Sequence, residues 1–294
     1  MTGTEPGVLA HAETLRAERR PFVLATVVRA QRPTSAKPGD RALVFADGTI
    51  EGFVGGTCAE SSVRLHGMRL LTTGEATLLR ITPGAEAERE DDGVVTVANP
   101  CHSGGSVEIF LEPQLPPALV TVFGDAPIAR ALHVVGGALG YAVGHGRPGA
   151  PIPPDTSAVV VATHGHDEAA ALAAALEAGV GYVGLIASRR RGAQVLAGLG
   201  VAGKERVHTP AGLDIGARTP AEIALSVYAQ LVATRPRRAP VRLAEATDPV
   251  CGMTVPIAQQ ALSATHEGHT YHFCGEGCLL TFTADPASYV DDGG

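Results

Sequence analysis

Three of the five cysteines in this 294-residue chain lie near its C-terminal end. Cys251, Cys274 and Cys278 follow the spacing Cys-x22-Cys-x3-Cys. The close pair can place two sulfurs on one side of a turn or helix start, where the distant cysteine can close a site. Thiolates select soft ions such as Zn²⁺ and Cu(I), and binding one would supply folding energy to a short segment. The alternative is that these cysteines are buried small hydrophobic residues.

The other two cysteines each lie within four residues of a glycine pair. Cys58 stands in "GFVGGTCAES" and Cys101 in "NPCHSGGSVEIFLEP". Glycine permits positive φ and exposes backbone N–H groups, as a loop that binds an anionic or polar ligand requires. A helix start beside Cys58 would also lower its thiol pKa. The alternative is two tight turns with incidental cysteines.

A third set of candidates follows strands in the middle of the chain. Gly124 begins "GDAPIA", in which alanines replace the later glycines of a Gly-x-Gly-x-x-Gly dinucleotide fingerprint, and no acid follows the next strand, "GHGR". Tight NAD binding is therefore disfavoured. Ser188 and Arg189 in "ASRRRG" suit contacts to a phosphate, although a basic first turn of a surface helix explains them equally well.

Composition narrows the class of protein. The net charge is −7, aromatic residues make up 4% and mean hydropathy is +0.14, so we expect no nucleic-acid partner. We find no apolar run near 18 residues and no secretory signal, and therefore expect no membrane span and a cytoplasmic location. The odd number of cysteines also favours a reducing compartment.

The elements that carry these candidates fall into three predicted domains. Residues 1–113 form an α+β domain with a hairpin that turns at Asp47-Gly48, and a stiff "PQLPP" joint follows. Residues 118–235 repeat strand, turn and helix, which predicts an α/β, doubly wound, Rossmann-like parallel sheet. Within it, Thr219 to Glu222 form a capping box. A Pro/Arg-rich linker leads to a small module over 247–291.

The C-terminal module resembles the YHS (TRASH-like) metal-binding family. The resemblance rests on "DPVCGM", "YHFCGEGC" and a final "F…DP..Y", and covers essentially the whole segment. It implies that Cys251, Cys274 and Cys278 bind a soft metal, Zn or Cu. His269 or His272 could complete a fourth position, although each is more simply an exposed histidine.

Residues 8–235 resemble the XdhC/CoxI family, in its CoxI-like branch. The motifs are "VRAQRPTSAKPGDRALVFADGTIEGFVGGTCAE", "CHSGGSVEIFLEP", "GYVGLIASRRR" and "GLDIGARTPAEIALSVYAQL". The resemblance implies a non-catalytic maturation factor that binds molybdenum cofactor, assists its sulfuration and passes it to a xanthine dehydrogenase or carbon monoxide dehydrogenase-type apoenzyme. A sulfurtransferase partner and a homodimer are also expected. The cofactor-binding candidates are Gly55, Gly56, Cys58, Glu60, Cys101, Ser103, Gly104, Gly105, Gly124, Ser188 and Arg189.

Two other classes stay open from the residues alone. One is an NAD(P)-dependent oxidoreductase, which the incomplete fingerprint disfavours. The other is a metal-responsive regulator, for which the sequence has no basic DNA-reading element.

Overall fold

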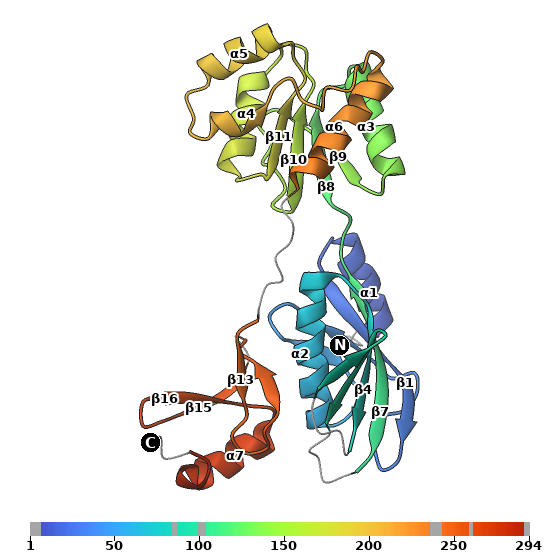
Figure 1. The fold of residues 1–294 in the computed structure, drawn as a ribbon, viewed down its shortest axis with the longest axis vertical. Helices are drawn as coiled ribbons and strands as arrows, with labels where there is room; N and C mark the ends of the chain where they lie inside the picture. The colour runs from blue at the N-terminus through green and yellow to red at the C-terminus, as the bar shows by residue number, and fades with distance from the viewer. Residues whose placement is uncertain (1–6, 84–87, 99–103, 236–242, 259–260, 291–294) are drawn as a thin grey trace, which may run out of the picture. The chain divides into compact units, whose positions relative to one another are not determined.

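The computed structural model describes residues 7–83, 88–98, 104–235, 243–258 and 261–290. The chain forms two compact units (Figure 1). One joins Met1–Pro116 to Arg238–Gly294, and the other is Pro117–Arg237. The three domain ranges proposed from the sequence stay predictions. Cys101, Ser103 and most of the predicted linker lie outside the described residues.

A seven-stranded mixed sheet forms the centre of the first unit. Its strand order is β3-β2-β1-β7-β4-β6-β5. The strands are β1 (Phe22–Gln31), β2 (Arg41–Val44), β3 (Ile50–Gly52), β4 (Thr77–Thr82), β5 (Arg89–Asp91), β6 (Val94–Ala98) and β7 (Ser106–Gln114). Two helices, α1 (Val8–Ala17) and α2 (Thr57–Thr73), accompany them. The predicted hairpin at Asp47-Gly48 is present as β2 and β3, whereas β5 was not predicted.

Helix α2 packs closely against the buried face of this sheet. A β-carbon on Gly67 would lie 2.9 Å from Val44, so glycine lets the helix approach the strand. Val63 of α2 lies in the same hydrophobic core as the alternating buried residues of β1. The helix ends at Gly74, whose φ of 78° supplies a left-handed C-cap. Sheet and helix thus fix the position of the N-terminus of α2.

The C-terminal part of the first unit is small. It contains the strand pairs β13 (Glu245–Thr247) with β14 (Thr254–Pro256) and β15 (Leu262–His266) with β16 (His269–Phe273), then α7 (Glu276–Ala284) and a 3₁₀ turn at Pro286–Ser288. Phe282 of α7 is 1% exposed and packs against Tyr271 and Phe273. Such a core is thin, so a metal-binding site would add stability.

The second unit is a five-stranded parallel sheet, as the alternating pattern predicts. The order is β12-β11-β10-β8-β9, from β8 (Leu119–Phe123), β9 (Ala142–Gly146), β10 (Thr156–Val161), β11 (Tyr182–Leu185) and β12 (Val207–His208). Its helices are α3 (Pro127–Ala138), α4 (Glu168–Glu177), α5 (Arg189–Gly198) and α6 (Pro220–Thr234). The strand order reverses between β8 and β10, the position where open α/β sheets bind ligands.

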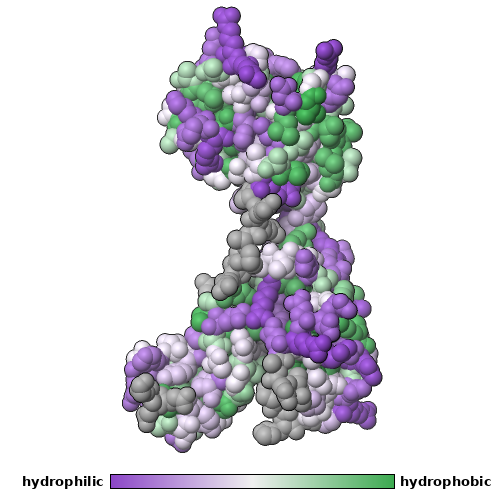
Figure 2. Space-filling view, viewed as in Figure 1, coloured by the Kyte–Doolittle hydropathy of each residue, from purple (hydrophilic) through white to green (hydrophobic). Residues whose placement is uncertain are grey.

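Helices α3 and α6 pack together beside this sheet. The Tyr228 hydroxyl of α6 donates a hydrogen bond to the Leu132 carbonyl at 2.9 Å. The predicted capping box is confirmed, because Thr219 and Glu222 exchange side-chain and backbone hydrogen bonds. Hydrophobic surface is visible in the region of these helices in Figure 2. Val134 of α3 and Val232 of α6 are exposed hydrophobic residues.

No helix in the described part of the chain is long and apolar enough to span a bilayer.

Candidate metal centre and ligand sites

Three thiols converge at one end of the C-terminal module. Cys251 lies in the turn between β13 and β14, Cys274 directly follows β16, and Cys278 lies in the first turn of α7. The Cys274 sulfur is 3.6 Å from the sulfurs of both Cys251 and Cys278. Tetrahedral Zn–S bonds of about 2.3 Å place sulfurs about 3.8 Å apart. The cluster therefore has a spacing suited to a soft metal ion.

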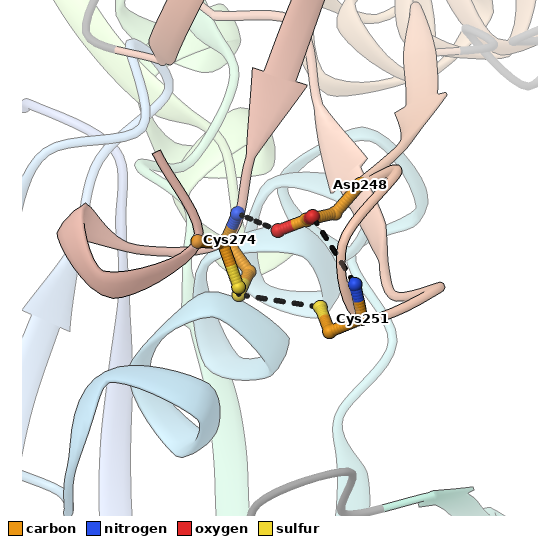
Figure 3. A group of neighbouring side chains, drawn as sticks. Asp248, Cys251 and Cys274 are labelled. Atoms are coloured by element: carbon orange, nitrogen blue, oxygen red, sulfur yellow. Dashed lines mark hydrogen bonds between the residues drawn. The ribbon is translucent and has the colours of Figure 1, made fainter. Parts of the chain in front are cut away.

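Asp248 holds two of these cysteines in place. Its side chain is buried, and its carboxylate accepts a hydrogen bond from the backbone N–H of Cys274 at 2.8 Å (Figure 3). The backbone N–H of Val250 donates another at 2.9 Å. A longer bond of 3.4 Å comes from the N–H of Cys251. Burial works to raise the pKa of Asp248, but these hydrogen bonds outweigh it and keep the pKa below its ordinary value.

Asp248 lies close enough to the three sulfurs to be considered as a metal ligand. Its carboxylate and the three sulfurs all lie within 4.8 Å of one another. Because both carboxylate oxygens already accept backbone hydrogen bonds, we assign Asp248 a positioning role. The sequence reasoning missed it, although an aspartate just before "PVC" is a typical start of a side-chain-stabilised turn.

The pKa values of the three thiols are shifted in different directions. The hydrogen bond from Cys274 lowers the pKa of Cys251, whereas hydrogen bonding to Cys251 and Cys58 raises the pKa of Cys274. Burial raises the pKa of Cys278 to about 12. A bound cation would displace the protons of these thiols, because a thiolate is the form that binds a metal ion.

Cys58 belongs to the same neighbourhood. It is the second residue of α2, and its thiol hydrogen-bonds the thiol of Cys274. The packing beside it is tight, since a β-carbon on Gly275 would lie 2.1 Å from Cγ2 of Thr57. The sequence reasoning assigned Cys58 and Cys274 to different sites, and the structure brings them together.

The glycines predicted to bind the cofactor near Cys58 and Cys101 differ in how much space surrounds them. Gly56 is the N-cap of α2 and Gly104 has a φ of 70°; neither has a neighbour within 4 Å of an added β-carbon. Gly105 is instead a packing residue, since its β-carbon would meet the Pro33 carbonyl at 2.0 Å. Gly55 has a φ of 137°. The Glu60 carboxylate pairs with Arg64, one turn along α2.

The two histidines considered as a fourth ligand lie elsewhere. His272 pairs with Ser263, and His269 with His266, in the β15–β16 hairpin. Neither belongs to the group of possible metal ligands among the described residues.

In the second unit, Ser188 and Arg189 line a cavity of about 1060 Å³. Ser188 caps α5 by accepting a hydrogen bond from the Arg191 N–H, so this cavity meets a helix N-terminus at the carboxyl end of the sheet. His164 and Thr209 line it too. Gly124 serves packing, because an added β-carbon would lie 2.4 Å from the Ala162 carbonyl oxygen.

Three stretches of the chain match models of known protein families. Residues 15–82 match the XdhC and CoxI family, 120–231 match the XdhC Rossmann domain, and 246–292 match the YHS domain. An uncharacterized protein YqeB from Escherichia coli is 28% identical over 76% of this chain. The chain spans only 46% of that relative's length.

Two further similarities cover a short segment or have low sequence identity. Over 43 residues, 15% of this chain and 5% of the relative, the sequence is 46% identical to a copper-transporting P-type ATPase from Rhizobium leguminosarum bv. viciae. A solved structure described as a xanthine dehydrogenase from Bacillus halodurans is 17% identical, with a TM-score of 0.37 over 76% of this chain and 94% of that one. The chain is therefore similar to the XdhC and CoxI family over residues 15–82, to the XdhC Rossmann domain over 120–231 and to the YHS domain over 246–292.

Proposed function

We propose that this protein is a maturation factor for a molybdenum hydroxylase, and not itself a catalyst. In this role it binds molybdenum cofactor, assists its sulfuration and passes it to an apoenzyme of the xanthine dehydrogenase or carbon monoxide dehydrogenase type. The observation that carries the proposal is the match of both halves of the chain, 15–82 and 120–231, to models of one family.

The glycine–cysteine loop before α2 suits part of this task. Gly56 leaves open space at the helix N-terminus, and the adjacent Cys58 offers a sulfur where the helix dipole favours anionic groups. Cys101, Ser103 and Gly104 are proposed to contribute from the second glycine loop.

The cavity of the second unit offers a separate subsite. The exposed guanidinium of Arg189 and the N-terminus of α5 can bind a phosphate, which the cofactor carries on its pterin side chain. The two subsites are proposed independently of each other.

Binding of isolated molybdenum cofactor to the purified full chain tests this function. Cys58→Ala and Cys101→Ala should each weaken binding, and Arg189→Ala should weaken it by about tenfold if a charge-assisted contact is lost. Arg190→Ala is the matched control, because Arg190 does not line the cavity. Unchanged affinity in all three test variants would contradict the proposed cofactor site.

We also propose that the YHS cysteines bind one soft ion, Zn²⁺ or Cu(I). Cys251, Cys274 and Cys278 provide the chemistry, and the spacing of their sulfurs supports the assignment. The full chain should retain about one metal per molecule after gel filtration, and the Cys274→Ser, Cys278→Ser double variant should retain none. Stoichiometric metal in the double variant would overturn this assignment.

The proposed partners are tested by affinity capture with the tagged full chain. A molybdenum hydroxylase apoenzyme and a sulfurtransferase are the expected partners, and a homodimer the expected state. Titration with NADH and NADPH separates this function from that of an oxidoreductase, for which saturable binding and turnover would be required.

A further inference from the structure

We propose that Cys58 of α2 supplies a fourth thiolate to the soft-metal site of the YHS domain. The ion would then be bound by four sulfurs from two domains of the chain and not by the YHS cysteines alone. This inference goes beyond the proposed function, because it concerns a resident structural ion and requires no binding of molybdenum cofactor. A Cys58 thiolate bound to this ion would not also contact the cofactor directly, so the two proposed roles of Cys58 are alternatives.

The first support is the arrangement of sulfurs around Cys274. Its thiol contacts three others, namely Cys251 and Cys278 at 3.6 Å each and Cys58 through a hydrogen bond. Four cysteine sulfurs are a common ligand set of structural zinc sites. The YHS module by itself supplies only three.

Cys58 lies outside the group whose ligand atoms are all within 4.8 Å of one another. Its sulfur must therefore move toward Cys251 and Cys278 when an ion binds. A change of rotamer about the Cα–Cβ bond can supply such a movement without displacing the helix. The inference thus predicts a local rearrangement of Cys58 on metal binding.

Packing around α2 shows why Cys58 is near the cluster. Gly275, directly after Cys274, lies against Thr57, where a β-carbon would be only 2.1 Å from Cγ2. Further along the helix, Arg69 forms two hydrogen bonds to Glu245 just before the Cys251 turn. Contacts at both ends of α2 therefore hold the YHS module beside Cys58.

Charge also favours a four-thiolate site here. Four thiolates around a divalent cation leave two net negative charges, which need positive potential nearby. Cys58 lies in the first turn of α2 and Cys278 in the first turn of α7. Both helices therefore direct their positive N-terminal ends toward the cluster.

Cobalt(II) in place of zinc provides the test, since its spectrum reports the ligands. With the full chain, X-ray absorption at the cobalt edge should show four sulfur neighbours. Cys58→Ser should show three sulfurs and one oxygen or nitrogen, and its thiolate-to-cobalt absorption should fall by about a quarter. Circular dichroism would establish that this near-isosteric variant retains its fold.

Cys101→Ser is the matched control, because it removes the other cysteine of the N-terminal region. It should leave four sulfurs, and loss of a sulfur in this variant would assign the fourth ligand to Cys101 and overturn the proposal. Three sulfurs in the wild-type chain, or four in Cys58→Ser, would overturn it as well. None of these readouts depends on molybdenum cofactor, so failure of the proposed function and failure of this inference are distinguishable.

Discussion

Arg69 and Glu245 join helix α2 to the YHS domain by a two-point ion pair, with Nε–Oε1 at 2.9 Å and Nη2–Oε2 at 3.0 Å. Arg69 also donates a hydrogen bond to Glu88 at 2.8 Å. The side chains of Arg69 and Glu245 are only partly exposed, at 31% and 29%. Bidentate geometry and partial burial distinguish this pair from an ordinary surface salt bridge.

We therefore expect Arg69 and Glu245 to be energetically coupled. A double-mutant cycle of Arg69→Ala and Glu245→Ala, measured by urea unfolding, should give a coupling free energy of about 1 kcal/mol. The Arg89–Asp91 pair is the control, because its side chains are 77% and 64% exposed. It should show no measurable coupling, and an equally small value for Arg69–Glu245 would refute this prediction.

Gly275→Ala should disturb the contact between the domains without removing a sulfur. The new methyl group meets Thr57, so we expect a loss of about 1–3 kcal/mol in the free energy of unfolding. Amide hydrogen exchange in the first turn of α2 should also become faster. Gly277→Ala is the control, since nothing lies within 4 Å of its added β-carbon. Equal behaviour of the two variants would show that the contact is not restrictive.

Asp248→Asn should weaken metal binding although Asp248 is not a ligand. An asparagine keeps one oxygen but presents an amide donor to backbone N–H groups, so Cys251 and Cys274 lose part of their support. We expect a tenfold or greater loss of Zn²⁺ affinity, measured by competition with a chelator, with the number of sulfur ligands unchanged. Asp285→Asn, an exposed change in the same domain, should have no effect. A lost ligand in the X-ray absorption spectrum of Asp248→Asn would contradict the positioning role.

Buried His66 should make stability depend on pH. Its ring is 4% exposed, and burial, helped by the nearby Arg69, lowers its pKa to about 4. In the unfolded chain the pKa is near 6.5, so between pH 6.5 and 4 the unfolded state binds the extra proton. This contribution is fully present above pH 6.5 and is lost as the pH falls toward 4.

The expected loss from His66 is about 2 kcal/mol between pH 7.5 and pH 5. Urea unfolding across this range should show a shallower pH dependence for His66→Gln than for the wild-type chain. His269→Gln, a change at an exposed histidine, should leave the slope unchanged. A slope that is the same in all three proteins would rule out His66 as its source.

Local features of the fold were predictable because their causes lie close together in sequence. The Thr219–Glu222 capping box, the Asp47-Gly48 hairpin and the Gly74 helix end each depend on a few consecutive residues. The parallel sheet followed from alternating strands and helices. The three YHS cysteines were found by spacing, because metal ligands are few and chemically distinctive.

The features that could not be predicted from the sequence depend on contacts between segments that are distant along the chain. The spacing of hydrophobic residues and the residue types at turns do not indicate that Gly275 packs on Thr57. They also do not indicate that the thiol of Cys58 contacts that of Cys274. Gly124 shows that a sequence motif can also have a structural cause that the motif does not indicate. Its place in a partial fingerprint indicated a ligand, whereas the structure supplies a packing reason, the Ala162 carbonyl.

Helix α2 contacts the C-terminal module through Thr57 and Cys58 at its first turn and through Arg69 three turns later, and it also packs against β14. Eleven residues of α-helix separate these points by about 16 Å along one stiff rod. Contacts this far apart on one rigid helix restrain the small domain against rotation more strongly than either contact alone. An ion bound by Cys58 and the YHS cysteines would add a covalent-strength restraint at the first turn, and its removal would leave the domain held by the Thr57–Gly275 packing, the β14 contacts and the Arg69–Glu245 pair.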